Sequence, residues 1–520
     1  MRNAGSGSAV SGNAISGNAG QRDAGLGSWT ARRAAISPGR TALVFGDRST
    51  TYAELHERVS RLAGKLRESG VGRGDRVAYL GPNHPAFVET MFATYVIGGV
   101  FVPLNFRLTA PEIDYQLQNS GAKVLIFGPE CSATVTESKQ TAELLRVVPL
   151  SGYEEWIADG DTQFQPVPVS LDEPACILYT SGTTGRPKGA VLTHGNLVWN
   201  CYNLLVGVDV AGDEVTLISA PLFHVAALNQ CLLPTILKGG CSVIMPSWGV
   251  DECFDLIARH GVTWMFGVTT MYAGLAQSPR WPAADLSSVR NLIVGGASIP
   301  PELIRIYLAR GLTFCQGYGM TETAPGATFL EAPETASHVG SAGVPVFFAD
   351  VRCVRPDLTD TAPGEPGEVQ VRGPNVTPGY WANDAATAQS FSDDGWFRTG
   401  DIAVMDDGGH YYIVDRLKDM FVSGGENVYP AEVEAAIFEH PAVVEAAVIG
   451  APDEKWGEVG RAFVVLSPDH SLTVDELRSF LSNRLARYKI PKYVDVVDGL
   501  PRTGSGKVRK APLRDLPLPG

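Results

Sequence analysis

The sequence has few cysteines, and they form no pattern typical of a disulfide framework or a metal site. Its eight cysteines are scattered over 520 residues, with no CxxC and no Cys/His cluster at metal-ligand spacing. We therefore expect free, mostly buried thiols and no structural zinc site. Free thiols suit a reducing environment, so we also expect a cytoplasmic location.

The sequence also lacks a long uninterrupted apolar run and an excess of positive charge. The most apolar segment, residues 87–104, contains Glu89 and two glycines, so we expect a buried helix followed by a strand and no integral membrane segment. Lys and Arg number 42 against 56 Asp and Glu, which gives a formal charge of −14. Because phosphate contacts need concentrated Lys and Arg, this balance argues against a nucleic-acid partner.

The length and composition are those of a globular protein with more than one domain. Hydrophobic residues make up 44% and charged residues 19% of the chain, and 520 residues exceed one ordinary core. Residues 1–27 are rich in Gly, Ser, Asn and Ala and lack the apolar core of a signal peptide, so we expect a disordered tail. Residues 28–417 are expected to form a large body, and residues 418–520 a small mobile lid domain.

Helix and strand patterns alternate along most of the chain. Thr51 and Glu54 form a capping box at the start of an amphipathic helix, and residues 76–80 predict a strand. The alternation resumes over residues 176–343, whereas residues 344–415 change to short β-rich segments with many Gly and Pro residues. We therefore predict the α/β class: a large N-terminal body of stacked α/β layers with a small β-barrel-like part, followed by a small mobile α+β C-terminal domain.

The loop after the apolar strand at residues 176–178 carries the strongest chemical signal. Residues 179–189 are Tyr-Thr-Ser-Gly-Thr-Thr-Gly-Arg-Pro-Lys-Gly. Glycines let backbone N–H groups approach phosphate oxygens, hydroxyls donate further hydrogen bonds, and the two cations offset charge. The loop is not a Walker A motif, because Pro187 stands at the second glycine of that pattern and Gly189 at its Ser or Thr. In isolation, such a loop could also be a plain surface turn.

In length and order, this string closely resembles the phosphate loop of the adenylate-forming superfamily, which comprises acyl-CoA synthetases, peptide-synthetase adenylation domains and beetle luciferases. The resemblance spans about residues 30–512 and recurs at further motifs, most closely those of the fatty acyl-CoA synthetases. It implies an ATP-dependent carboxylic acid–CoA ligase that forms acyl-CoA through an acyl-adenylate, with release of pyrophosphate and AMP. The implied cofactors and co-substrates are ATP, Mg²⁺ and coenzyme A, and the expected acid is a medium- or long-chain fatty acid.

The resemblance also assigns a nucleotide site. It places Tyr318 against the adenine and Thr321 on the α-phosphate. Glu322 and Thr184 are implied to hold Mg²⁺, which one or two carboxylates and substrate phosphates usually bind. Asp401 is implied to hold the ribose, since a carboxylate accepts two hydrogen bonds from a vicinal diol. The full set of implied ATP- or AMP-binding residues is Thr180, Ser181, Gly182, Thr183, Thr184, Gly185, Lys188, Gly295, Gly296, Ala297, Gln316, Gly317, Tyr318, Asp401 and Arg416.

Other motifs are implied to carry the chemistry and the acyl pocket. Lys507, in a basic loop, matches the family's catalytic lysine, which bridges carboxylate and α-phosphate oxygens while charge builds in the transition state. His224 matches a residue that lies over the acyl site, where an imidazole can orient a carboxylate; a lone His on an apolar segment is otherwise more often a core residue. The implied catalytic residues are Lys507, Glu322, Thr321 and His224. The implied acyl pocket comprises His224, Phe266, Gly319 and Met320, with Trp264, Val268 and Asn229 as further candidates.

The remaining motif concerns the thioester step. Lys418 matches the family's hinge, a position that needs only backbone freedom at a domain junction. In the CoA ligases, the loop that follows this hinge lines the pantetheine tunnel. The alternative is that the segment here is a simple turn before the helix at Pro430. For Arg416, a salt bridge at a domain interface is the alternative role. The implied CoA-binding residues are Ser423, Gly424, Gly425 and Glu426.

The motifs leave several alternatives open. The acid could be of an aryl or cinnamic type in place of a fatty acid. The acceptor could be an amine or a free-standing carrier protein, and a luciferase-like oxygenase or a catalytically inactive sensor would share the same fold. The oligomeric state is open between monomer and homodimer.

Overall fold

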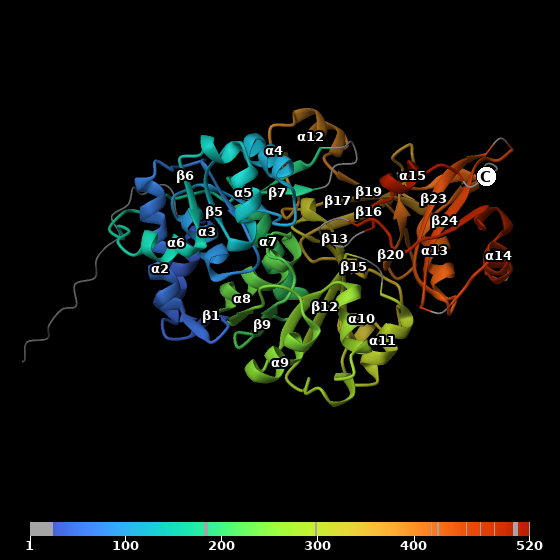
Figure 1. Cartoon of the computed structure of the whole chain (residues 1–520), viewed down its shortest axis with the longest axis horizontal. Helices are drawn as coiled ribbons and strands as arrows, with labels where there is room; N and C mark the ends of the chain where they lie inside the picture. The colour runs from blue at the N-terminus through green and yellow to red at the C-terminus, as the bar shows by residue number, and fades with distance from the viewer. Residues whose placement is uncertain are drawn as a thin grey trace, which may run out of the picture.

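The computed structural model describes residues 24–180, 186–296, 299–417, 419–423, 426–453, 455–468, 470–482, 484–502 and 508–518; for Arg416, Glu426 and Asn427 it describes the backbone alone. Within these residues the chain forms two large sheets that are mainly parallel and two smaller sheets that are mainly antiparallel. The elements before residue 350 make up one end and the middle of the molecule, and the C-terminal elements, drawn in orange and red, lie at the other end of its long axis (Figure 1).

The first large sheet has five parallel strands in its centre, joined by helices that cross over between them. Two further strands, which run antiparallel, extend one edge. In order, its strands are β18 (Gly379–Tyr380), β8 (Lys188–Thr193), β7 (Pro174–Thr180), β4 (Val100–Leu104), β3 (Arg76–Leu80), β5 (Ala122–Phe127) and β6 (Arg146–Pro149).

The second large sheet has a parallel centre and antiparallel strands at both edges. In order, its strands are β15 (Val344–Pro345), β14 (Gly326–Leu330), β13 (Phe314–Gly319), β12 (Asn291–Gly295), β11 (Trp264–Gly267), β9 (Val215–Ile218), β10 (Cys241–Ile244), β1 (Thr41–Phe45) and β2 (Arg48–Thr51). The sequence prediction of largely parallel sheets is confirmed.

The two smaller sheets follow later in the chain. The four-stranded sheet occupies the β-rich region and is antiparallel throughout; its strands are β16 (Asp350–Val354), β17 (Pro366–Arg372), β19 (Phe397–Met405) and β20 (Tyr411–Arg416). The C-terminal sheet consists of β22 (Glu426–Val428), β21 (Phe421–Ser423), β24 (Gly457–Leu466) and β23 (Val443–Asp453), with β25 (Tyr493–Val496) parallel to β24. The predicted class, a large N-terminal α/β body with a smaller C-terminal α+β domain, is confirmed.

Helices cover and separate the large sheets. One hydrophobic core contains residues from both large sheets and from helices that include α2, α3, α7 and α8, whereas two further cores lie against the other faces of these sheets. The α-helices of the described residues are α1 (Trp29–Ile36), α2 (Tyr52–Glu68), α3 (Pro85–Val96), α4 (Ala110–Ser120), α5 (Ser132–Glu137), α6 (Leu150–Ile157), α7 (His194–Gly207), α8 (Leu233–Lys238), α9 (Val250–His260), α10 (Thr269–Gln277), α11 (Pro301–Leu308), α12 (Asp384–Ser390), α13 (Pro430–Phe438), α14 (Val474–Ser482) and α15 (Ala511–Arg514).

Local signals explain where several of these helices begin. At α2, the Thr51 hydroxyl accepts a hydrogen bond from the Glu54 N–H, and the Glu54 carboxylate accepts one from the Thr51 N–H at 2.7 Å, which is the predicted capping box. Helix α3 and strand β4 are the buried helix and strand predicted for the most apolar segment. The acid of that helix, Glu89, is 1% exposed and accepts hydrogen bonds from Arg58 and from the Tyr153 hydroxyl, both at 2.6 Å. Its charge is therefore paired inside the core.

The cysteines follow the expectation of free thiols. All eight are free, seven of them are buried, and Cys241 is partly buried. Burial raises the pKa of the Cys131 thiol to about 11 and that of Cys315 to about 12, so both stay protonated near neutral pH. In the part of the chain that the structure describes, no helix is long and apolar enough to cross a bilayer.

Candidate active site

The candidate active site lies at the carboxyl ends of β12 and β13. Ligands of α/β proteins usually bind in the crevice outside the carboxyl ends of parallel strands. The predicted residues Gln316, Gly317, Tyr318 and Gly319 lie on β13, Met320 follows it, and Thr321 and Glu322 lie in the short helix η6 (Thr321–Thr323). Two predicted residues from elsewhere in the chain, Gly295 on β12 and Phe266 on β11, lie on neighbouring strands of the same sheet.

Bare backbone and one aromatic ring form part of this region. A Cβ on Gly295 would lie 3.2 Å from the Gly317 carbonyl oxygen and 3.4 Å from the Phe266 ring. Gly296 has a φ of +86°, in the left-handed region that favours glycine. The absence of side chains on adjacent strands leaves a flat surface against which a planar ligand can pack.

Tyr318 and Asp401 meet although they are 83 residues apart in sequence. The Tyr318 hydroxyl donates a hydrogen bond to Asp401 Oδ2 at 2.7 Å, and Asp401 is 6% exposed. Asp401 on β19 is also the Cα partner of Arg416 on β20. The fold therefore brings together three residues that the sequence assigned to the adenine and the ribose.

We expect Tyr318→Phe to raise the KM for ATP by about ten- to hundredfold, since a hydrogen bond to a charged group contributes about 1.5–3 kcal/mol. The change keeps the aromatic ring but removes the hydroxyl that orients Asp401. Steady-state kinetics with ATP as the varied substrate measures the effect. Tyr488→Phe, at an exposed tyrosine, is the control and should leave KM unchanged. An unchanged KM in Tyr318→Phe would show that this hydrogen bond does not position the ribose site.

Glu322 is held by a residue that the sequence did not single out. The Tyr380 hydroxyl donates a hydrogen bond to Glu322 Oε1 at 2.9 Å, and Glu322 is 7% exposed. Burial raises the pKa of Tyr380 far above its ordinary value, so this hydroxyl keeps its proton as a donor. The Lys188 ammonium lies 5.1 Å from the centre of the Tyr380 ring. Tyr380 thus links the predicted metal ligand to a predicted phosphate-binding cation.

Two buried asparagines anchor the segments near the predicted acyl-pocket residues. The buried Asn83 accepts a hydrogen bond from the Leu222 N–H at 2.8 Å and donates one to the Ala220 carbonyl at 3.0 Å, so it holds the segment that carries His224. Asn229, a candidate pocket residue, is fully buried and donates to the Ala324 carbonyl at 2.6 Å, which anchors the turn after η6. No local sequence pattern indicated the role of Asn83.

Gln230 is a further residue that sequence reasoning missed. It belongs to a π-helical turn, η4 (Ala227–Leu232). Such turns are rare in proteins, but those that occur are often found at functional sites. It is 7% exposed, and among the described residues its Oε1 has no hydrogen-bond partner. Its amide nitrogen would lie 3.8 Å from a Cβ placed on Gly317. A buried side-chain amide with an unsatisfied acceptor therefore lies beside the bare backbone of β13.

The other predicted residues lie apart from this cluster or outside the described residues. The Thr180 hydroxyl donates to the Lys188 carbonyl at 3.4 Å across the β7–β8 pair. Trp264 is buried on β11 in the core that both large sheets share, and Ser423 is buried in β21 of the C-terminal sheet. The predicted residues outside the described part of the chain are Ser181, Gly182, Thr183, Thr184, Gly185, Ala297, Lys418, Gly424, Gly425 and Lys507.

Comparison with known proteins identifies the family. A model of the AMP-binding enzymes matches residues 30–381, and a model of the AMP-binding enzyme C-terminal domain matches residues 432–507. The chain belongs to the AMP-binding enzyme family. The resemblance to adenylate-forming enzymes is thereby confirmed.

Relatives of known activity extend over almost the whole chain. A feruloyl-CoA synthase of an Amycolatopsis species is 52% identical over 493 residues, which cover 95% of this chain and 99% of that protein. A long-chain-fatty-acid–CoA ligase of Mycobacterium tuberculosis is 37% identical over 501 residues, 94% of this chain and 98% of the relative. The solved structure of the O-succinylbenzoate–CoA synthetase of Bacillus subtilis with ATP and magnesium has a TM-score of 0.85 and 33% identity, with 94% of this chain and 98% of that chain covered.

The chain is therefore an ATP-dependent, AMP-forming acid–CoA ligase that uses ATP, Mg²⁺ and coenzyme A. The residues present fit Mg²⁺, because the Glu322 carboxylate is a hard oxygen ligand and Tyr380 links it to Lys188, which is predicted to contact the phosphates. When bound, the ion neutralises charge on the phosphate oxygens. The other predicted ligand, Thr184, lies outside the described residues.

Proposed function

We propose that the acid is of an aryl, cinnamic type. The expected fatty acid has weaker support, because the fatty-acid ligase is 37% identical to this chain and the feruloyl-CoA synthase is 52% identical. The structural observation that carries the proposal is the buried side-chain amide of Gln230: its nitrogen lies beside Gly317, and its oxygen has no hydrogen-bond partner among the described residues. An alkyl chain would leave this acceptor unsatisfied, whereas the phenolic hydroxyl of a hydroxycinnamic acid would donate to it.

We propose that the reaction proceeds through two successive nucleophilic displacements. In the first, the carboxylate attacks the α-phosphorus of ATP and pyrophosphate leaves, with Thr321 and Lys507 proposed to stabilise the charge that develops on the α-phosphate. Asp401 and Tyr318 hold the nucleoside in place, which lowers the entropy cost of the reaction. In the second, the CoA thiolate attacks the acyl carbon and AMP departs. We propose that rotation about Lys418 brings the CoA-binding loop, residues 423–426, to the site for this step.

A screen of acids tests the proposed substrate class. Pyrophosphate release is measured with saturated fatty acids of six to sixteen carbons and with benzoic, cinnamic and hydroxycinnamic acids, each with and without CoA. We expect kcat/KM for the best hydroxycinnamic acid to exceed that for every fatty acid by at least about tenfold, the discrimination that a shaped pocket commonly provides. A fatty acid with the highest kcat/KM would overturn the proposal.

Gln230→Met tests the specificity determinant at nearly constant side-chain volume. The wild type should prefer 4-hydroxy-3-methoxycinnamic acid over unsubstituted cinnamic acid, and the variant should lose about three- to tenfold of that preference, which corresponds to one neutral hydrogen bond of about 0.5–1.5 kcal/mol. The kcat/KM for cinnamic acid is the internal control and should change less than twofold. An equal loss on both acids would mean that Gln230 supports packing alone.

A further inference from the structure

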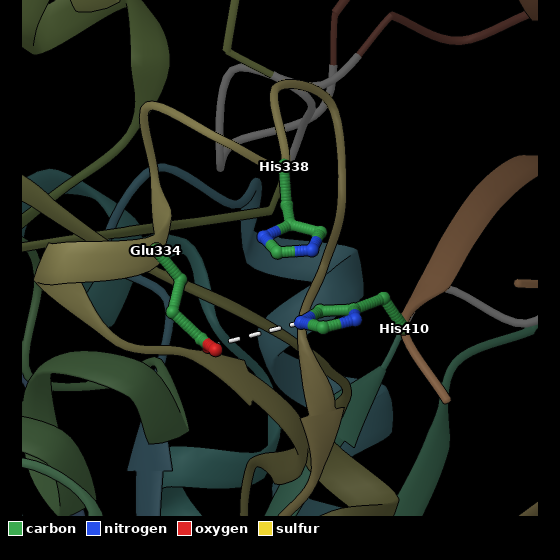
Figure 2. Close-up of side chains that lie close together, drawn as sticks. All are labelled: Glu334, His338 and His410. Atoms are coloured by element: carbon green, nitrogen blue, oxygen red, sulfur yellow. Dashed lines mark ion pairs between the residues drawn. The ribbon is translucent and has the colours of Figure 1, made fainter. Parts of the chain in front are cut away.

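Three potential metal ligands gather at the junction of the second large sheet and the four-stranded sheet, and none of them is among the active-site residues described above. Glu334 ends the short helix η7 (Ala332–Glu334), His338 lies in the loop between η7 and β15, and His410 precedes β20. One ligand atom from each lies within 4.8 Å of those from the other two. Figure 2 shows the two imidazole rings one above the other, with the Glu334 carboxylate directed towards His410.

His410 is the buried member of this cluster. It is 7% exposed, and among the described residues neither of its ring nitrogens has a hydrogen-bond partner. Its Nε2 lies 3.8 Å from Glu334 Oε2, and its Nδ1 lies 3.6 Å from Asp406 Oδ1, distances too long for hydrogen bonds. A buried imidazole with two unsatisfied nitrogens is unusual, because buried polar groups are nearly always bonded.

We propose that Glu334, His338 and His410 bind one divalent transition-metal ion, and that zinc fits best. Two imidazole nitrogens and one carboxylate oxygen match the ligands that zinc prefers, whereas Mg²⁺ prefers oxygen ligands alone. A zinc ion about 2.0–2.1 Å from each ligand needs the ligand atoms to be about 3.3 Å apart, so the cluster must contract from separations of up to 4.8 Å, which include 3.8 Å between His410 and Glu334.

His338 must reorient for the ion to bind. Its ring stacks on that of His410 with 3.8 Å between the centres and 13° between the planes. A metal ion binds a nitrogen lone pair that lies in the plane of the imidazole ring. The lone pairs of two stacked rings therefore lie in nearly parallel planes and do not converge on one ion. His338 is only partly buried and lies in a loop, and rotation about its side-chain bonds would turn one nitrogen towards the ion.

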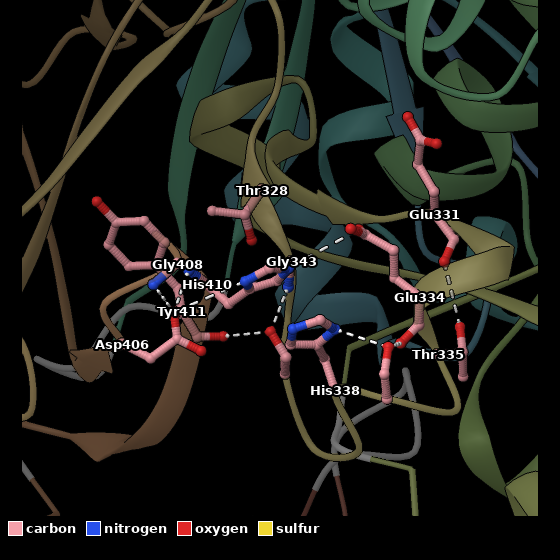
Figure 3. Close-up of polar contacts among 12 residues, drawn as sticks. Thr328, Glu331, Glu334, Thr335, His338, Gly343, Asp406, Gly408, His410 and Tyr411 are labelled. Carbon is pink, nitrogen blue, oxygen red and sulfur yellow. Dashed lines mark hydrogen bonds and ion pairs between the residues drawn. The ribbon is translucent and has the colours of Figure 1, made fainter.

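Asp406 lies where a carboxylate can orient His410 as a metal ligand. Its Oδ1 accepts hydrogen bonds from the backbone N–H groups of Gly408 and His410, both at 2.9 Å, which hold it near His410 Nδ1 (Figure 3). If His410 Nδ1 carries its proton towards Asp406, Nε2 is left as the acceptor that faces Glu334. Metal-binding histidines usually donate their second N–H to a carboxylate or carbonyl in this way.

A bound ion would link the segment between η7 and β15 to the β19–β20 hairpin. The backbone already joins them, because the Ala342 N–H donates to the Tyr411 carbonyl at 2.7 Å and the Tyr411 N–H donates to the Gly343 carbonyl at 2.9 Å. His410 stands at the turn end of the β19–β20 hairpin, and Asp401 and Arg416 pair at its open end. A bound ion would therefore stabilise the sheet that carries the predicted ribose-binding residues.

Metal titration of the full-length, tag-free chain tests the proposal. After treatment with a chelator and dialysis, Zn²⁺ is added in the presence of excess Mg²⁺ and followed by calorimetry, and Co²⁺ is followed by visible absorption. We expect one Zn²⁺ per chain, visible absorption bands from nitrogen-ligated Co²⁺, and a higher melting temperature with Zn²⁺. The absence of stoichiometric Zn²⁺ binding by the folded wild type would overturn the proposal.

Variants assign the ligands without disturbing the buried histidine. Loss of a residue that supports a metal ligand typically weakens metal binding by about 10–100-fold. We expect Asp406→Asn to weaken Zn²⁺ binding within that range, and His338→Ala and Glu334→Gln each to weaken it by at least as much. His470→Ala, at an exposed histidine of the C-terminal domain, is the matched control and should bind Zn²⁺ like the wild type. Since His338 is not part of the ligase site, its variant should keep the ligase rate measured without zinc. Equal Zn²⁺ affinity in wild type and His338→Ala would refute the assignment.

Discussion

Lys507→Ala should lower the rate of acyl-adenylate formation by at least about 10²–10³-fold, the effect of removing one group that stabilises transition-state charge. Lys507 is proposed to bridge the carboxylate and α-phosphate oxygens while negative charge builds between them. The residues on either side of its loop pair with each other, Arg502 with Val508 in an antiparallel bridge, and the Arg509 N–H donates to the Pro501 carbonyl at 2.7 Å. ATP–pyrophosphate exchange with the acid measures the loss.

The second half-reaction separates this role from a structural one. Thioester formation from supplied acyl-adenylate and CoA should stay within about threefold of wild type, because no charge builds on a pentacoordinate phosphorus in that step. Lys455→Ala, at an exposed lysine of the same domain, should leave both half-reactions unchanged. If Lys507→Ala slowed both half-reactions equally, the catalytic assignment would be wrong.

Glu322→Gln should reduce kcat/KM for ATP by about 10²–10³-fold, comparable to the removal of a charged transition-state contact. The substitution keeps the size of the side chain and an acceptor for the Tyr380 hydroxyl, but it removes the charge that is proposed to hold Mg²⁺. The Mg²⁺ concentration that gives half of the maximal rate should rise as well. Kinetics over a range of Mg²⁺ concentrations measures both changes.

Two further variants define the cause of that loss. Tyr380→Phe keeps the carboxylate and removes one hydrogen bond to it, so it should cost about ten- to hundredfold at most. Glu302→Gln, at an exposed glutamate of α11, should have no effect. A Glu322→Gln enzyme with an unchanged Mg²⁺ requirement would exclude Glu322 as a metal ligand.

Much of the fold could be predicted because its signals are local. The capping box of α2 depends on two residues that are three positions apart in sequence. The apolar composition of the segment that forms α3 and β4 is enough to predict a buried helix and strand. The motif of β13 and η6 is continuous, so its residues had to lie together whatever the rest of the chain does. Such signals act within one or two turns of backbone and do not depend on tertiary packing.

Other residues of the site could not be predicted, because their roles arise from contacts between distant segments. Tyr380 reaches Glu322 from β18, which pairs with β8 at Ala190. Asn83 reaches Leu222 across 139 residues. Gln230 is recognisable from its burial and from an amide oxygen that has no partner among the described residues, and both depend on how the helix η4 packs against β9 and β11.

The sequence by itself determined the enzyme family and the activation of an acid by ATP, because contiguous motifs specify the phosphate loop and the β13–η6 segment. From cysteine spacing it also predicted no structural zinc site, and the site proposed at Glu334, His338 and His410 departs from that prediction. Only the tertiary structure decided that His410 meets Glu334 and His338, since His410 comes from a separate segment that is brought to theirs where the two sheets join. Spacing along the chain reveals ligands that share a helix or a loop, whereas ligands from separate segments become neighbours only when the sheets that carry them pack together.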